Sequence, residues 1–218
     1  MTYQLLVFDW DGTLMDSITR IVACMRQAFG ECGLPSPGNE TIHQVIGLGL
    51  DEAIAALAPE LQAATRQRIA QYYRRHYRAP EGIPTPLHEG ADSVLSTLRG
   101  AGYHLAIATG KGRRGLDRAL IHSGLDKYFD ASRCADESPS KPHPAMLESL
   151  MLELHCPPQA TLMIGDSEYD MQMAMHAGAD ALAVCHGVHD EFRLRGAGAL
   201  DCLMNLRAIP GWLKQHIR

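Results

Sequence analysis

Short apolar runs alternate along the chain with segments of helical periodicity. The runs are Leu5–Phe8, His104–Ala108, Tyr128–Ala131, Thr161–Ile164 and Ala181–Val184. They are continuously apolar rather than alternating, which predicts parallel strands that are covered by helices on both faces. We therefore predict an α/β fold built on a doubly wound parallel sheet, which binds ligands at the carboxyl ends of its strands.

A long insertion separates the first two predicted strands. The sequence between Phe8 and His104 is far longer than the roughly twelve residues that a crossover between parallel strands needs. Residues 17–79 have the apolar spacing of helices, and prolines at 80, 84 and 86 then favour an extended return. We predict an inserted helical cap over residues 17–80, hinged near Asp16 and near 80–86. Residues 1–16 and 81–218 form the predicted α/β catalytic core.

Composition and charge narrow the class of protein. Of the 218 residues, 46% are hydrophobic and 21% are charged, as in an ordinary globular protein. The formal net charge of −5 gives no general electrostatic reason to bind nucleic acid or an anionic membrane. We interpret the basic stretch from Arg66 to Arg78 as the solvated face of a cap helix whose tyrosines pack inward. We expect no nucleic-acid or membrane partner, and either a monomer or a homodimer.

The N-terminal sequence and the sulfur-containing residues add further expectations. The chain begins without a basic leader, and Leu5–Phe8 is too short for a signal peptide or a membrane span, so we expect a cytoplasmic protein. The six cysteines are scattered without a C-x-x-C pair, which favours reduced thiols. The methionines Met171, Met173 and Met175 are predicted to fill the core.

Two carboxylates stand at the end of the first predicted strand. Asp9 and Asp11 are two residues apart, so in an extended chain they face the same side, roughly 6.6 Å from each other. Gly12 then allows the chain to turn sharply out of the strand. Asp-Gly is also a common turn dipeptide, so this pair alone does not indicate an active site.

A second acidic pair follows the fourth predicted strand. Asp166 lies at the strand end, and Asp170 lies four residues later, in the expected first turn of a helix. The ends of both strands meet in one crevice, where four carboxylates repel one another and are driven to protonate unless a cation is bound. Carboxylate oxygens favour a hard divalent ion, so the sequence predicts a magnesium site.

Residues that suit a phosphate group are found after the second strand and before a later helix. Thr109, Gly110 and Lys111 offer a hydroxyl and backbone N–H groups at a strand-to-helix turn, where the helix dipole favours an anion. Lys141 adds a positive charge in a stretch that is stiffened by Pro142 and Pro144. Each signal is weak alone, but their placement together indicates a site that handles a phosphate.

These motifs together resemble the haloacid dehalogenase superfamily, and within it the phosphoglycolate phosphatase branch, with a helical cap on a Rossmann-like core. The resemblance spans nearly the whole chain. It is carried by Asp9-Trp10-Asp11-Gly12-Thr13-Leu14, Ala108-Thr109-Gly110-Lys111, Lys141-Pro142-His143-Pro144 and Gly165-Asp166-Ser167-Glu168-Tyr169-Asp170-Met171. It implies magnesium-dependent hydrolysis of a small phosphorylated metabolite, such as phosphoglycolate or a sugar phosphate. Gly110 departs from the pattern, because relatives often carry Asn or Ser there.

The resemblance also implies roles for individual residues. Asp9 is the implied nucleophile, and Asp11 protonates the leaving oxygen before it acts as the base for water. Thr109 and the Gly110 amide bind the phosphoryl oxygens, while Lys141 balances the charge of the nucleophile. The implied magnesium ligands are Asp9, the backbone carbonyl of Asp11 and Asp166, with Asp170 in support through water or an outer contact.

Four alternatives share parts of this pattern. A sugar-phosphate phosphomutase of the same superfamily has the same core motifs and remains open. A dehalogenase needs neither Asp11 nor a magnesium site, and a phosphonatase uses a cap lysine, whereas residues 1–80 contain none. A receiver-type signalling module also combines aspartates, magnesium, a hydroxyl and a lysine. Its phospho-acceptor usually follows a middle strand, so Asp9 after the first strand and the long insertion point away from it.

Overall fold

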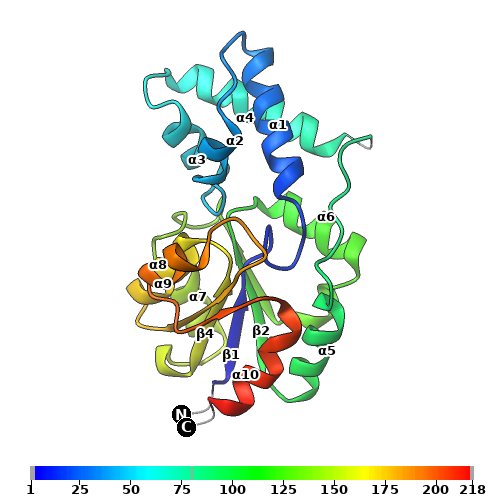
Figure 1. Cartoon of the computed structure of the whole chain (residues 1–218), viewed down its shortest axis with the longest axis vertical. Helices are drawn as coiled ribbons and strands as arrows, with labels where there is room; N and C mark the ends of the chain where they lie inside the picture. Colours follow the sequence, from blue (N-terminus) through cyan, green and yellow to red (C-terminus); the bar gives the residue numbers. More distant parts are fainter. Residues whose placement is uncertain (1–2, 80, 217–218) are drawn as a thin grey trace.

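A parallel sheet forms the centre of the molecule (Figure 1). The computed structural model of the chain describes residues 3–79 and 81–216. The strands are β1 (Leu5–Phe8), β2 (His104–Thr109), β3 (Ala131–Cys134), β4 (Thr161–Gly165), β5 (Asp180–Val184) and β6 (Cys202–Leu203). They pair in parallel in the order β3-β2-β1-β4-β5-β6, which is the order of a Rossmann-type doubly wound sheet. The predicted fold class is confirmed.

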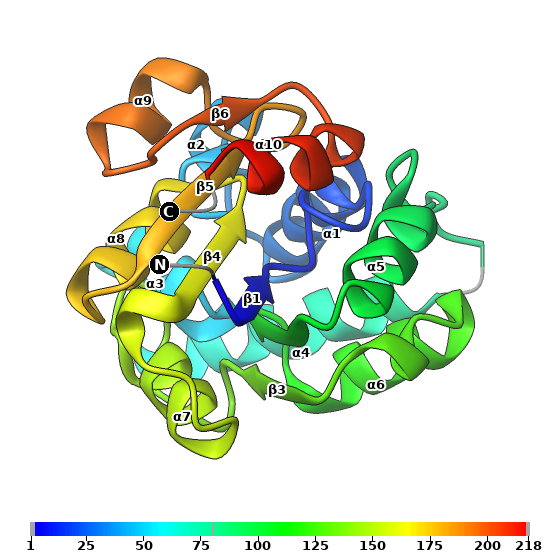
Figure 2. The ribbon, with the colours of Figure 1, turned by 90° about the horizontal axis from the view of Figure 1, so that it is seen from below.

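Two layers of helices cover the sheet (Figure 2). One face carries α5 (Ala91–Gly100), α6 (Arg113–Ser123) and α10 (Ile209–Gln215), and the other carries α7 (Ala145–Glu153), α8 (Glu168–His176) and α9 (Glu191–Gly196). Short 3-10 turns lie at η1 (Asp126–Tyr128), η2 (Pro158–Ala160) and η3 (Leu206–Ala208). Alternate residues of β1 supply both layers, since Leu6 and Phe8 pack on one side and Leu5 and Val7 on the other. All four are buried, which explains the continuous apolar run.

Helices also fill the connection between β1 and β2, as predicted. α1 (Ile18–Glu31), α2 (Asn39–His43), α3 (Leu50–Leu57) and α4 (Ala63–Arg78) stand together beyond the carboxyl end of the sheet (Figure 1). They enclose an apolar cluster of their own, which includes Phe29, Ile42, Ile54 and Ile69. α5 instead packs on the sheet through Leu95. The domain limits of 17–80 for the cap and 1–16 with 81–218 for the core stay a prediction.

The third strand differs from its prediction. Tyr128 belongs to η1, and β3 begins only at Ala131, where the predicted run Tyr128–Ala131 ends. The aromatic side chains of Tyr128 and Phe129 pack, partly buried, against the core. This packing accounts for the apolar residues that predict a strand there. β3 is an edge strand and includes Ser132 and Arg133, so it lacks the apolar run of a central strand. The two-residue strand β6 is also missing from the prediction.

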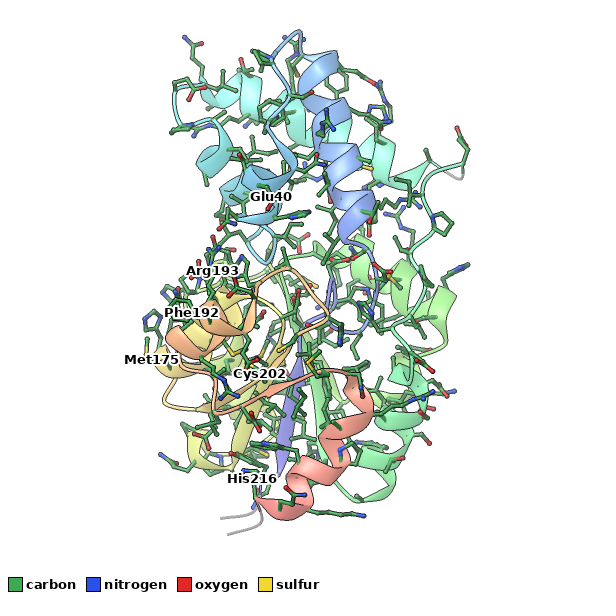
Figure 3. All side chains as sticks on the ribbon, viewed as in Figure 1. Glu40, Met175, Phe192, Arg193, Cys202 and His216 are labelled. Atoms are coloured by element: carbon green, nitrogen blue, oxygen red, sulfur yellow. The ribbon has the colours of Figure 1, made fainter. Side chains whose placement is uncertain are left out.

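Two large apolar side chains on the outer helices point away from the sheet (Figure 3). Met175 on α8 is 57% exposed and Phe192 on α9 is 90% exposed. Met171 and Met173 are fully buried, as predicted, but the prediction for Met175 is wrong. Met171 and Met175 lie about one helical turn apart, so helix periodicity does not distinguish them; Met175 differs in lying in the last turn of α8, which ends at His176.

All six cysteines are free thiols, as predicted. Within residues 3–79 and 81–216, no helix combines the length and the hydropathy that a membrane crossing requires.

A core truncation tests the central position of β4. Leu162 is fully buried and pairs in register with Leu6, so Leu162→Ala leaves a cavity and is expected to lower the free energy of unfolding by about 2–5 kcal/mol. Leu152→Ala is the matched control, because Leu152 is 78% exposed, and its effect should stay within about 0.5 kcal/mol. Urea unfolding followed by circular dichroism measures both. Equal losses would contradict the packing described here.

Candidate active site

The candidate site lies at the carboxyl ends of three neighbouring strands. Asp9 follows β1, Thr109 ends β2 and Asp166 follows β4, while β1 pairs with both of the other strands. The strand order reverses between β1 and β4, and a crevice opens there because successive crossovers leave on opposite faces. The predicted residues are thus brought together by the sheet.

Three buried carboxylates converge in this crevice. Oxygens of Asp9, Asp166 and Asp170 lie within 4.8 Å of one another. Asp166 Oδ1 accepts a hydrogen bond from Thr13 Oγ1 (2.7 Å), and its Oδ2 accepts one from the Val188 amide (2.8 Å). These bonds fix the Asp166 oxygens and leave them grouped with the other two carboxylates, as the ligands of a cation must be.

Asp170 is held by the start of α8. Its Oδ2 accepts hydrogen bonds from the backbone N–H (3.1 Å) and the hydroxyl (2.7 Å) of Ser167, the residue that caps the helix. Its Oδ1 lies 2.6 Å from Lys141 Nζ. The same lysine lies 2.8 Å from Asp9 Oδ1. Lys141 therefore bridges two of the three carboxylates, and its side chain is fully buried.

Burial and charge shift the pKa values of this cluster. Burial raises the pKa of Asp9 to about 7; the Lys141 ammonium opposes this rise, and the Asp170 carboxylate adds to it. Burial, followed by the charges of Asp9 and Asp170, raises the pKa of Asp166 well above its ordinary value. Burial acts to lower the pKa of Lys141, but the carboxylates of Asp170 and Asp9 outweigh it and keep the lysine charged. One ammonium thus faces three carboxylates, and a bound divalent cation would supply the missing positive charge.

The side chain of Asp11 lies outside the triad. Both of its carboxylate oxygens contact Lys111 Nζ, at 2.8 and 2.9 Å, and Oδ1 also accepts a hydrogen bond from Ser17 Oγ at 2.6 Å. Lys111 Nζ in turn donates to the hydroxyl of Tyr77 on the cap helix α4 (3.3 Å) and lies 4.5 Å from the centroid of its ring. Asp11 is therefore tied to the start of the cap and, through Lys111, to the end of α4.

Gly110 lies directly beneath a loop of the cap. A Cβ atom at this position would stand 2.4 Å from the carbonyl oxygen of Leu48 and 2.9 Å from that of Gly47, which is closer than real Cβ atoms come. The following amide, that of Gly49, donates a hydrogen bond to Ser140 Oγ of the core (2.7 Å). The close approach of the cap backbone gives a physical reason for glycine at 110, where the sequence departs from the expected Asn or Ser.

A cavity of about 360 Å³ lies between cap and core. Asp9, Asp11, Thr109 and Gly110 line its core end, and Thr109 is buried at the end of β2. Apolar side chains of the cap line the opposite wall, among them Ile21, Met25, Val45 and Leu48. A ligand would thus meet carboxylates and a hydroxyl at the core end, and apolar side chains together with charged ones such as Arg74 and Asp51 on the cap side.

Several residues of the site escaped the sequence analysis. Ser17, Thr13 and Tyr77 each position a predicted residue, but hydroxyl groups are too common for their spacing to reveal such contacts. Ser167 carried a usable signal, because a serine three residues before an acidic residue is the pattern of a helix start.

Known proteins resemble this chain over most of its length. A family model described as haloacid dehalogenase-like hydrolase matches residues 6–184. Probable phosphatase IndB of Dickeya dadantii is 35% identical, over 94% of this chain and 97% of that protein. A phosphoglycolate phosphatase of Colwellia psychrerythraea is 28% identical, over 84% of this chain and 85% of that protein. The crystal structure of a hydrolase from Pseudomonas syringae, 24% identical, has the same fold, with a TM-score of 0.87 over 98% of this chain and 99% of that one.

The carboxylate cluster predicts a metal effect that depends on pH. The pKa of Asp9 in the folded, metal-free protein is raised to about 7, so its protonated form stabilises the fold at low pH, and this stabilisation is lost as the pH rises to 7. Magnesium binds the ionised carboxylates, so its stabilising effect should be larger at pH 8 than at pH 5.5. At a hundred times its Kd it adds about 2.7 kcal/mol.

Differential scanning calorimetry of chelator-treated protein, with and without magnesium chloride, measures this effect as a rise in Tm. Asp166→Asn removes one carboxylate charge and should abolish most of the rise. The same rise at both pH values, or an undiminished rise in the variant, would contradict a cation at this cluster.

Proposed function

The chain belongs to the haloacid dehalogenase-like hydrolase family, and from this premise we propose that it is a magnesium-dependent phosphatase that hydrolyses a small phosphomonoester through a phosphorylated Asp9. The observation that carries the proposal is the grouping of Asp9, Asp166 and Asp170 around the buried Lys141 at the crevice between β1 and β4. A nucleophile, a counter-charge and a set of oxygen ligands meet there beside the cavity between cap and core.

The proposed reaction has two displacement steps. Asp9 attacks phosphorus with a carboxylate oxygen, the bond from phosphorus to the ester oxygen breaks, and Asp11 gives a proton to the departing alcohol. Water then attacks the aspartyl phosphate and gives a proton to Asp11, and the bond between phosphorus and Asp9 breaks to release phosphate. The Thr109 hydroxyl and the Gly110 amide hold the phosphoryl oxygens, and the Lys141 ammonium favours the ionised form of Asp9.

Magnesium is the cation that suits this donor set. Oxygen ligands of this kind favour a hard divalent ion, and Asp9, Asp166 and the backbone carbonyl of Asp11 would hold it, with Asp170 in support. When bound, it supplies positive charge to the phosphoryl oxygens and the nucleophile. Lys141, 2.8 Å from Asp9 Oδ1, orients the nucleophile.

The role of Asp11 requires a movement. Its carboxylate is engaged by Lys111 and Ser17, so it must exchange these contacts to reach the leaving oxygen. Ser17 immediately precedes α1, and Lys111 contacts Tyr77 near the end of α4. Movement of the cap therefore changes the surroundings of Asp11, the proposed acid. Entry of the substrate is in this way coupled to the release of Asp11 from Lys111 and Ser17.

Phosphoglycolate is the small substrate that the comparisons suggest, since a relative that covers most of this chain bears the name phosphoglycolate phosphatase. A phosphomutase would instead pass the phosphoryl group to a second hydroxyl, and the release of inorganic phosphate distinguishes the two. A signalling module is disfavoured because its sheet order, 2-1-3-4-5, differs from the order found here.

Replacement of the nucleophile tests the proposal directly. Asp9→Asn keeps the shape of the side chain but cannot attack phosphorus, so the rate of phosphate release from 2-phosphoglycolate and p-nitrophenyl phosphate should fall by about a thousandfold or more. Asp126→Asn is the matched control, because Asp126 is exposed in η1, and should keep the wild-type rate.

Chelation should stop the wild-type reaction, and magnesium should restore it. Turnover by a freshly purified Asp9→Asn protein near the wild-type rate would remove Asp9 from the nucleophile role. Full activity in excess chelator would remove the metal.

The contact between Gly110 and the cap loop predicts a second effect on activity. Gly110→Ala places a Cβ atom against the Leu48 carbonyl and forces the loop away from the phosphate site, so kcat/KM should fall by at least about tenfold. Gly100→Ala is the control, because no atom lies within 4 Å of a Cβ there. Equal activity of the two variants would show that the loop does not need its close approach.

A further inference from the structure

Two pairs of arginines from different parts of the molecule face the same cavity. Arg74 and Arg78 lie one turn apart on the cap helix α4, and Arg114 and Arg118 lie one turn apart on the core helix α6. All four line the cavity that contains Asp9. In Figure 1 the last turns of α4 lie above α6, so the helices that carry the two pairs lie on either side of the boundary between cap and core.

Three of these arginines have no acidic partner among residues 3–79 and 81–216. Arg74 lies 3.5 Å from Asp51, but within the described part of the chain no carboxylate lies within ion-pair distance of Arg78, Arg114 or Arg118. The other acids of the lining are largely engaged: Asp11 binds Lys111, and Asp136 accepts a hydrogen bond from the Arg113 amide at the start of α6. Glu52 is the remaining acidic side chain of the wall.

Arg78, Arg114 and Arg118 are exposed side chains that line one cavity, and they concentrate three positive charges there although the net charge of the chain is −5. Like charges on facing helices repel one another, and an anion between them removes that repulsion. The planar, five-donor guanidinium matches the oxygens of a phosphate with paired hydrogen bonds. A carboxylate carries one negative charge and is neutralised by one arginine, so a group of three arginines favours a dianion.

We propose that the substrate carries a second phosphate group, which Arg78, Arg114 and Arg118 bind while the first phosphate lies at Asp9. This inference rests on the proposed function and gives its substrate class: a small organic bisphosphate. The apolar wall formed by Ile21 and Met25 contacts the carbon skeleton between the two phosphates. Because the arginines come from both cap and core, the second phosphate also draws the cap onto the core.

A matched pair of substrates tests the inference. Butyl phosphate and 1,4-butanediol bisphosphate differ only by the second phosphate, and phosphate release with magnesium gives kcat/KM for each. The bisphosphate should be favoured at least tenfold, the equivalent of about one charge-assisted hydrogen bond. The ratio should approach one in the double variant Arg114→Ala/Arg118→Ala.

The control is Arg66→Ala/Arg68→Ala, which removes the same charge from α4 at positions that do not line the cavity, and it should keep the wild-type ratio. Equal kcat/KM values for the two substrates in the wild type would overturn the inference. So would faster turnover of a phosphotyrosine peptide or of a 5′-phosphorylated oligonucleotide than of the bisphosphate.

A binding measurement separates failure of this inference from failure of the proposed function. Butane-1,4-bisphosphonate and butylphosphonate cannot be hydrolysed, and calorimetry with the magnesium-loaded protein compares their Kd values. Tighter binding of the bisphosphonate, by at least about tenfold and lost in Arg114→Ala/Arg118→Ala, supports the arginine site even if no phosphomonoester is turned over. Equal Kd values overturn it even if butyl phosphate is hydrolysed.

Discussion

The candidate site depends on one buried lysine. Lys141 has no exposed side-chain surface, and its ammonium group lies 2.8 Å from Asp9 and 2.6 Å from Asp170. Carboxylates that lose their water must be compensated, and removal of one partner from a buried ion pair leaves an uncompensated charge in a medium of low dielectric constant. Lys141 is present in every state of the protein, whereas a metal ion binds and leaves. It therefore allows the acidic crevice to exist before any cation arrives.

A second cationic group connects the chemistry to the cap. Lys111 holds the carboxylate of Asp11 and contacts Tyr77, while Ser17 holds the same carboxylate at the start of α1. The segment that enters the cap thus contacts Asp11 directly, and the segment that leaves it contacts Lys111, the partner of Asp11. The cap in turn touches the phosphate side of the cavity through backbone atoms at Gly110. These contacts connect the position of the cap to the orientation of Asp11, and we expect substrate entry to affect both.

The central strands and the acids that follow them could be predicted from the sequence, because burial and strand order strongly constrain which residues can stand there. β1 and β4 are buried on both faces, so their residues must be apolar, and the acids after them have only one edge of the sheet to occupy. The edge strands were different: β3 contains Ser132 and Arg133, and β6 has only two residues. The contacts of Ser17, Tyr77 and the arginines of α6 depend on how the cap rests on the core. That geometry arises from packing between distant segments and leaves no periodic signal in the sequence.

The central place of β1 in the sheet has a consequence for how the chain is made. β1 is synthesised first, yet its neighbours begin at His104 and Thr161. At about 5–20 residues per second, the four apolar residues of β1 wait roughly 8–30 s for β4 to leave the ribosome. The cap helices contact one another over short sequence distances and can form during this interval, before the core. In a nascent chain, the polypeptide would thus carry a folded cap ahead of the sheet that it covers, with the strand that leads to Asp9 still unpaired.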